Sequence, residues 1–592
     1  MNKKVQMKVL ILKTMKNRIL IFCLCAAHSM LIGQNSTHDT YLGIGTGRRT
    51  IALTEKIQEM PNTIDSTVDM SAVKYYLEPK KHETEFNAVP IKPAKLKIVE
   101  PLDKLYNGYV KAAAGTYIMP LLDVYYNATR SKVNSWGVNG LHHSAIGSIA
   151  DVGLSQFSEN KIGGFYTHFL DKQDLKLNLN YKRDVFHYYG FSQDSLIVPQ
   201  EYIDNSDTTR QVYNLIEFSG DFKSRNVGRD TSKLNYHGSL DYHFLNNISG
   251  STENYFKVGA EIGKFLKKEE FIVSLDVDVN NLNQVQWDKN NGSWQEGETI
   301  SSTNSIINAN PHIFSRGGNW KAKAGLSLQA NIDDKAKFYF YPDLECSYSL
   351  FNNLFIPYLG VNGGLQRNNL NSIRLLNPFV ADDSKLRNTN QRINLFGGIR
   401  GSVSNNMTFN LSASFEKLND MYFFVPDTVS SFENKFQLLY DNMDKTTFAG
   451  QLSYKKAEKL KLFAKGEFFF YSLTDESNQA WQMPNYKFTI SGVYDIADKI
   501  IIKSSVFLVG SRATFSYLQP VGLDVEEFEF INDRFEYKLK PFIDMNLGVE
   551  YRYNKRISAF VDFNNFTASK YQRWMNHPVQ SINIFGGVTF TF

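Results

Sequence analysis

The chain has 592 residues, of which 42% are hydrophobic, 14% aromatic and 21% charged, and its formal net charge at pH 7 is +5. This composition is too polar for a bundle of membrane helices and too aromatic for a disordered chain, so we expect a folded protein. After about residue 107, no Pro/Ser-rich linker or charge run divides the sequence. The chain therefore lacks the boundaries expected of several soluble domains.

The N-terminus has the features of a secretory signal. Residues 1–18 contain six basic residues and no acidic ones, and an apolar run follows at 19–27. We expect residues 1–33 to be removed as a signal peptide. A retained membrane anchor is the alternative, although the apolar run is short for spanning a bilayer. Loss of six positive charges would change the net charge from +5 to −1, which argues against nucleic acid as a partner.

From residue 107 onward, apolar and polar residues alternate, which is typical of β-strands with two different faces. The alternation is clearest in 175–182, 271–280, 407–415, 460–468 and 557–563. Strands of about 10 to 15 residues are longer than those of most soluble sheets and can cross a bilayer at a tilt. We therefore predict an all-β fold: a transmembrane antiparallel β-barrel of about 22 strands (roughly 20–24) over residues 107–592, preceded by a short extended periplasmic or lumenal segment at 34–106.

The connections between the predicted strands also alternate in length. Short polar turns are expected near 171–173, 267–269, 352–353, 405–406, 497–498 and 554–555. Long loops are expected between them, near 190–210, 282–302, 367–391, 511–541 and 567–580. Short turns on one side and long loops on the other are typical of outer-membrane barrels.

Alternation also assigns residues to the two faces of the barrel wall. The candidate lumen-facing residues carry both signs of charge: Lys176, Lys182, Asp276, Asp278, Lys461, Lys465, Glu467 and Asp562. Aromatic residues near strand ends predict a girdle at the level of the lipid headgroups, with Tyr188, Tyr189, Phe468 and Phe470 as candidates. Outer-membrane lipid is therefore an expected partner.

The last strand indicates the compartment. One face carries Ile582, Ile584, Val588, Phe590 and Phe592. This pattern resembles the terminal strand of outer-membrane β-barrel proteins of Gram-negative bacteria, whose C-terminal aromatic residue is read by the assembly machinery. The resemblance implies that Phe592 and Phe590 form an assembly signal and that the protein is located in the outer membrane.

A closer resemblance covers the closing hairpins. Residues 545–566, with the aromatic stretch 571–574 and the glycine-containing strand around 586–588, resemble the end of TonB-dependent receptor barrels of the Bacteroidota type. Members of that family carry an N-terminal globular plug. Here only the proline-containing segment 34–106 precedes the barrel, and a plug does not fit comfortably there. The resemblance therefore implies a receptor-like barrel without a plug, and TonB-driven uptake is not inherited from it.

No arrangement of residues in the sequence predicts a cofactor, a metal or an enzyme. The glycines of 43–47 have no strand before them and no helix after them, so they do not form a phosphate loop. Several histidines, namely His142, His143, His187, His237 and His243, lack a cysteine or carboxylate cluster that would complete a metal site. Ser144 lies beside His143, with Asp151 close by, but adjacent positions on a strand point to opposite faces.

Two functions follow from these features. The first is a subunit of an outer-membrane complex for envelope protein assembly, secretion or surface display, with periplasmic partners on 34–106 and surface lipoproteins on the long loops. The alternative is a transporter or channel for a bulky or hydrophobic solute. In both cases something must fill the lumen, because an open barrel of this size would breach the permeability barrier.

Overall fold

A computed structural model describes residues 105–128, 131–150, 152–191, 206–225, 233–267, 269–288, 295–427, 433–517 and 528–592. The predicted signal peptide and nearly all of segment 34–106 lie outside these ranges. The predicted domain boundaries, and the expectation that no plug is present, therefore remain predictions.

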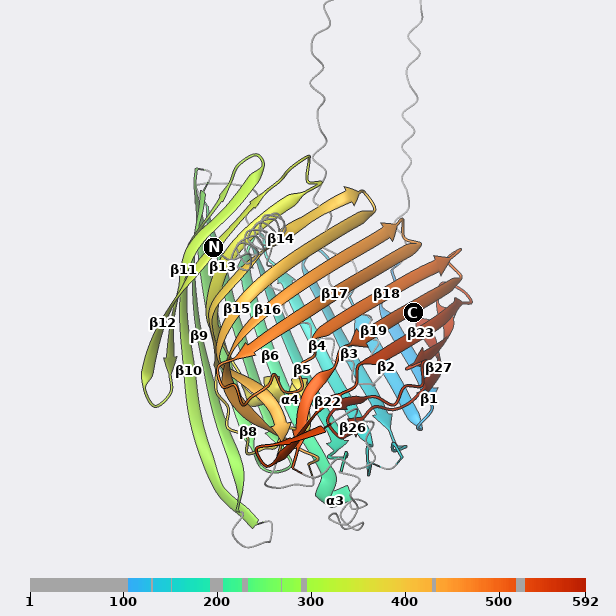
Figure 1. Cartoon of the computed structure of the whole chain (residues 1–592). Helices are drawn as coiled ribbons and strands as arrows, with labels where there is room; N and C mark the ends of the chain where they lie inside the picture. Colours follow the sequence, from blue (N-terminus) through green and yellow to red (C-terminus); the bar gives the residue numbers. More distant parts are fainter. Residues whose placement is uncertain are drawn as a thin grey trace, which may run out of the picture. The chain divides into compact units, whose positions relative to one another are not determined.

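Twenty-two strands form one closed antiparallel sheet (Figure 1). In chain order they are β1 Gly108–Gly115, β2 Met119–Asn127, β3 Asn134–Ala145, β4 Phe157–Phe169, β5 Gln173–His187, β6 Arg210–Ser224, β7 Leu234–Asn247, β8 Thr252–Leu266, β9 Glu269–Asp288, β10 Gln295–Arg316, β11 Trp320–Ile332, β12 Ala336–Tyr348, β13 Ile356–Gln366, β14 Thr389–Ser404, β15 Met407–Pro426, β16 Phe436–Lys456, β17 Leu460–Leu473, β18 Tyr486–Ile496, β19 Ile500–Val509, β23 Phe542–Arg552, β24 Ile557–Asn564 and β27 Asn583–Thr591. The first and last strands pair, with Tyr109 opposite Thr591, and this pairing closes the barrel. The predicted fold class and strand number are confirmed.

The long connections carry small elements of their own. These are α3 Ser206–Thr209, α4 Leu370–Leu376, β20 Arg512–Ser516, β21 Phe528–Ile531, β22 Arg534–Leu539, β25 Gln572–Trp574 and β26 His577–Pro578. In the part of the chain that the structure describes, no helix is long and apolar enough to cross a membrane.

The two faces of the sheet differ in chemistry, as the alternation predicts. On β9 the apolar side chains of Val273, Leu275 and Val277 are exposed on the outer face, whereas Asp276 and Asp278 point to the other face. An apolar exterior requires a lipid environment, and the pairing of β1 with β27 closes the sheet within it.

The predicted short turns lie at the end of the barrel that holds Phe592, and the long connections lie at the opposite end, here called the loop end. The prediction of a long loop at 282–302 is wrong. There β9 and β10 continue as a paired hairpin, with Leu282 opposite Ser302 and Gln284 opposite Ile300. The segment is rich in polar residues, which is typical of a loop. The backbone hydrogen bonds that pair two strands do not require apolar side chains, however, so a polar segment can still form a hairpin.

Candidate functional site: the lumen and the loops that cover it

Three long loops meet across the mouth of the barrel at the loop end. They follow β5, β13 and β24, which are the fifth, thirteenth and twenty-first strands of the 22-stranded ring. The Tyr188 hydroxyl donates to the Val380 carbonyl at 3.2 Å, and the Tyr189 hydroxyl donates to the Pro578 carbonyl at 3.1 Å. Strands so far apart in the ring lie on different sides of the lumen, so loops that touch each other must cross the opening.

The loop between β13 and β14 is tied to the inner wall by two arginines. Arg367 forms an ion pair with Asp278 of β9 and also donates to Asn304 of β10. Arg374 of α4 contacts the Asp184 carboxylate of β5 at 3.1 Å. All these groups are largely shielded from solvent, where charge-assisted hydrogen bonds are stronger than at an exposed surface. The arginines therefore fix this loop inside the lumen.

A buried carboxylate receives the start of α4. Glu253 of β8 is fully buried and accepts the backbone N–H groups of Leu370 and Asn371 at 2.6 and 3.2 Å. His243 of β7 contacts the same carboxylate at 2.8 Å. The first N–H groups of a helix have no partner within the helix, so this wall residue satisfies them and sets where the helix begins. The Asn369 side chain completes the cap by accepting from the Ser372 N–H.

The end of the same loop is held at Asp382. Its carboxylate accepts hydrogen bonds from Tyr213 and Asn247, both at 2.8 Å, and from Ser249. Gln284 donates to the Asp382 carbonyl at 2.8 Å. Three strands and a turn of the wall thus converge on one residue of the loop. This anchor and the two arginines hold the loop along its whole length.

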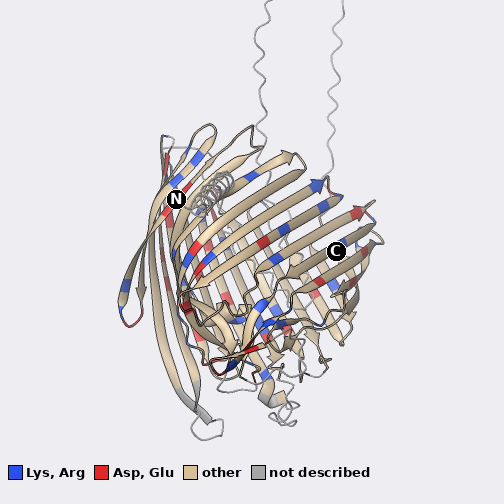
Figure 2. Ribbon diagram, in the orientation of Figure 1, with Lys and Arg blue, Asp and Glu red and all other residues tan. Residues whose placement is uncertain are grey.

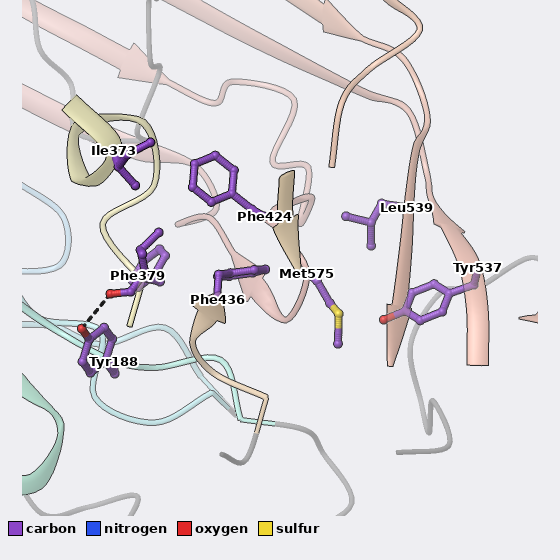
Figure 3. Close-up of a cluster of buried hydrophobic side chains, with 9 residues drawn as sticks. Tyr188, Ile373, Phe379, Phe424, Phe436, Tyr537, Leu539 and Met575 are labelled. Atoms are coloured by element: carbon purple, nitrogen blue, oxygen red, sulfur yellow. Dashed lines mark hydrogen bonds between the residues drawn. The ribbon is translucent and has the colours of Figure 1, made fainter. Parts of the chain in front are cut away.

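Where the loops meet, their apolar side chains form a packed core, here called the loop cluster (Figure 3). Its buried members are Tyr188, Ile373, Phe379, Val380, Phe424, Phe436, Tyr537, Leu539 and Met575. They come from five separate connections or strand ends of the barrel. Hydrophobic burial, rather than membrane lipid, therefore stabilises the loop end.

Two of the predicted girdle residues belong to the loop cluster instead. Tyr188 is 3% exposed, and Tyr189 packs against the loop cluster with its ring 5.3 Å from that of Phe379. A girdle residue must reach lipid, so their assignment to the girdle is wrong: the chain turns inward after β5 and carries both rings over the lumen. Phe468 and Phe470 are exposed on the outer face, 45% and 59% respectively, and their girdle role remains a prediction.

The connections that form the loop cluster also carry buried ionisable groups. Arg512 donates to the backbone carbonyls of Gln572 and Arg573, which joins β20 to β25. Burial, with mutual repulsion between Arg512 and Arg573, lowers the pKa of Arg512 to about 10, and burial lowers that of Arg573 to about 10. Both groups therefore stay positively charged at neutral pH. Burial also lowers the pKa of His577 to about 4, so this ring is neutral at pH 7.

The predicted lumen-facing residues are paired in small groups rather than gathered at one point. Their contacts are Lys182 with Asp184 at 2.9 Å, Asp276 with Asn308 at 3.2 Å, Asp278 with Arg367, Lys461 with Glu458 at 3.1 Å, Lys465 with Glu467 at 3.1 Å, and Asp562 with Lys111 at 4.0 Å. Lys176 is exposed on the face of β5 that carries Lys182. Figure 2 shows charges of both signs along the strands. Of this set, the structure brings Lys182 and Asp278 to the anchored loop.

The residues that hold the loop in place were missed in the sequence. Arg367, Arg374 and Asp382 fall in a segment predicted only as a loop. Asn369 followed three residues later by Ser372 is the one local signal, because this spacing is typical of a helix cap. Their wall partners are far away in the sequence, so no local pattern predicts them. Within the described ranges, no group of three His, Cys, Asp or Glu side chains is placed to hold a metal ion.

Comparison with known proteins shows the fold. No family model and no curated protein matches the chain. Among solved structures, the copper transporter OprC aligns over 82% of this chain and 80% of its own, with a TM-score of 0.56 and 10% identity. A mutant of the ferric enterobactin receptor PfeA from Pseudomonas aeruginosa aligns over 82% of this chain and 81% of its own, with a TM-score of 0.60 and 13% identity. The FrpB iron transporter from Neisseria meningitidis aligns over 83% of this chain and 82% of its own, with a TM-score of 0.60 and 10% identity.

The chain is an outer-membrane β-barrel protein with the fold of TonB-dependent receptors. At these identities the likeness concerns architecture alone. The structures that share this barrel are receptors and transporters by name.

Proposed function

We propose that this protein is an outer-membrane transporter that admits a bulky solute from the loop end of its barrel. The observation that carries the proposal is the meeting of three loops across the mouth, each fixed to the wall or to the others by side-chain contacts. A barrel of this width needs an occluding element that can move. The named functions of OprC, PfeA and FrpB support the same conclusion.

The chemistry of the loop cluster indicates the kind of solute. Rings of Tyr189, Phe379 and Phe436 offer apolar contact area, and the buried guanidinium groups of Arg512 on β20 and Arg573 on β25 provide positive charge in the same set of loops. A charge in a shielded site attracts its opposite more strongly than one in water. We therefore expect a solute with an apolar body and an anionic group.

The subunit function predicted from the sequence has less support. The loops that were expected to bind surface lipoproteins contact one another instead. The segment expected to bind periplasmic partners, 34–106, lies almost wholly outside the described residues. The periplasmic partners and the surface lipoproteins remain predictions.

Conductance in a planar bilayer tests the proposal. The purified barrel should be silent or nearly so, and replacing residues 367–388 with a short Gly-Ser linker should give large, steady currents. Replacing the connection 349–355 at the opposite end with the same linker is the matched control and should leave the barrel silent. A variant lacking 34–106 shows whether that segment adds to the closure. The proposal is wrong if the loop replacement, the 34–106 deletion and the variant that combines them all fail to conduct, because the protein would then not provide a path through the membrane.

A further inference from the structure

Three side chains on neighbouring strands are hydrogen-bonded in series. The hydroxyl of Ser144 lies 3.3 Å from Nε2 of His142, and Nδ1 of His142 lies 2.7 Å from Oδ1 of Asn160. Ser144 and His142 are two residues apart on β3, so they share a face, and Asn160 of β4 is directly opposite His142. A serine, a histidine and an acceptor in this order are the parts of a hydrolytic triad.

The series lies on the outer face of the barrel. Val138 and Ile162, which share that face, are 51% and 67% exposed. His143, the histidine adjacent to Ser144 in the sequence, points the opposite way, as the alternation predicts: it is 2% exposed, and its ring packs 5.2 Å from that of Phe157. The histidine two positions before the serine is the one in reach.

A fourth side chain fixes the orientation of the series. The amide Nδ2 of Asn160 donates to the Ser158 hydroxyl at 3.0 Å, which leaves Oδ1 of Asn160 directed at His142. An acceptor at Nδ1 holds the proton there, so Nε2 is left as the acceptor for the Ser144 proton. The neutral amide orients the ring as a carboxylate would, although it stabilises a protonated ring less.

The series lies near the loop-end edge of the outer face. Ser144 is next to the last residue of β3, and Leu122, which is directly opposite His142 on β2, is an apolar side chain 46% exposed on the same face. Glycerolipids place their ester carbonyls at the boundary between headgroups and acyl chains. Arg183 of β5 is directly opposite Asn160 and shares the outer face, so it provides a positive charge beside the series that a phosphate headgroup could contact.

We propose that Ser144, His142 and Asn160 form a second site, separate from the lumen, that hydrolyses carboxylic esters of membrane lipids. Ser144 Oγ attacks the ester carbonyl while His142 Nε2 takes its proton. The carbon–oxygen bond to the glycerol breaks, and the alkoxide leaves as an alcohol with the proton from His142. Water then attacks the acyl-serine, His142 takes a proton from the water and returns it to Ser144, and a fatty acid is released. This activity is independent of transport, since it uses the outer face alone.

The test uses the full chain in mixed micelles with a diacyl phosphatidylcholine, and its diether analogue as the substrate that cannot be hydrolysed. We expect fatty acid release from the diester only. Ser144→Ala and His142→Ala should each lower the rate about 10³-fold, and Asn160→Ala should lower it less. Ser305→Ala is the matched control, because Ser305 lies on the outer face of β10 opposite Val279 and Ile332, with no histidine. It should leave the rate unchanged.

A covalent label gives a second readout. An alkyl sulfonyl fluoride with a sixteen-carbon chain should modify Ser144 and not Ser305, as located by peptide mass spectrometry, and His142→Ala should abolish the label. Heat-modifiable electrophoretic mobility confirms that each variant is folded. The proposal is overturned if folded wild-type protein releases no fatty acid, if Ser144→Ala releases it at the wild-type rate, or if the label does not distinguish the two serines.

Discussion

Acid should loosen the loop cluster through His577. Its ring lies 3.9 Å from Phe379 and 5.1 Å from Tyr189, and this burial lowers its pKa from 6.5 to about 4. The packed loops thus bind the proton less readily than the opened loops do. Their stability is complete above about pH 6.5 and is lost as the pH falls towards 4. The gap between the two pKa values corresponds to on the order of 3 kcal/mol, enough to change the population of open loops roughly 100-fold.

Hydrogen exchange measured by mass spectrometry tests this reasoning. The packed loops protect the amides of residues 571–579 from exchange. After correction for the intrinsic pH dependence of exchange, most of the roughly 100-fold change in this protection should occur between pH 7 and pH 4.5. His577→Phe keeps an aromatic ring in place and removes the titration, so its protection should stay nearly level over the same range. An equal loss in the variant would mean that other groups respond to acid, and an unchanged wild type would refute the assigned burial.

Three further predictions concern the anchors and the seam of the barrel. Arg367→Ala should destabilise the packed loop by about 3 kcal/mol because it leaves the shielded carboxylate of Asp278 without its ion pair. The loss should be measured as faster proteolysis of 367–388. Arg225→Ala breaks an exposed ion pair with Asp174 and should have almost no effect. Gly190→Ala should disrupt the loop cluster, since a Cβ would lie 2.3 Å from the Asn576 backbone oxygen. Gly250→Ala has a similar positive φ, but its Cβ would meet only the Val285 side chain at an ordinary 3.4 Å, so it should cost only about 1 kcal/mol by thermal unfolding. Deleting Phe592 should lower the yield of heat-modifiable barrel in the outer membrane, and normal assembly would disprove its role as a signal.

The alternation of side chains determined most of the wall. Because neighbouring residues of a strand point to opposite sides, the sequence alone assigns Leu275 and Val277 to one face and Asp276 and Asp278 to the other. The same local rule, with the spacing of turns, gives the strand number and places the short turns at one end. These features depend on residues a few positions apart, so a linear reading recovers them.

Closure of the sheet decided the rest. It brings Arg367 to Asp278 across 89 positions of the chain and Tyr188 to Val380 across 192, and no local pattern encodes either contact. It also turned two tyrosines of the predicted girdle inward. On the outer face, Ser144 and His142 share a side by periodicity alone, but only the register of β3 against β4 sets Asn160 opposite the histidine. Strand faces are fixed by sequence spacing, whereas the partners of loops and of neighbouring strands are fixed by how the whole barrel closes.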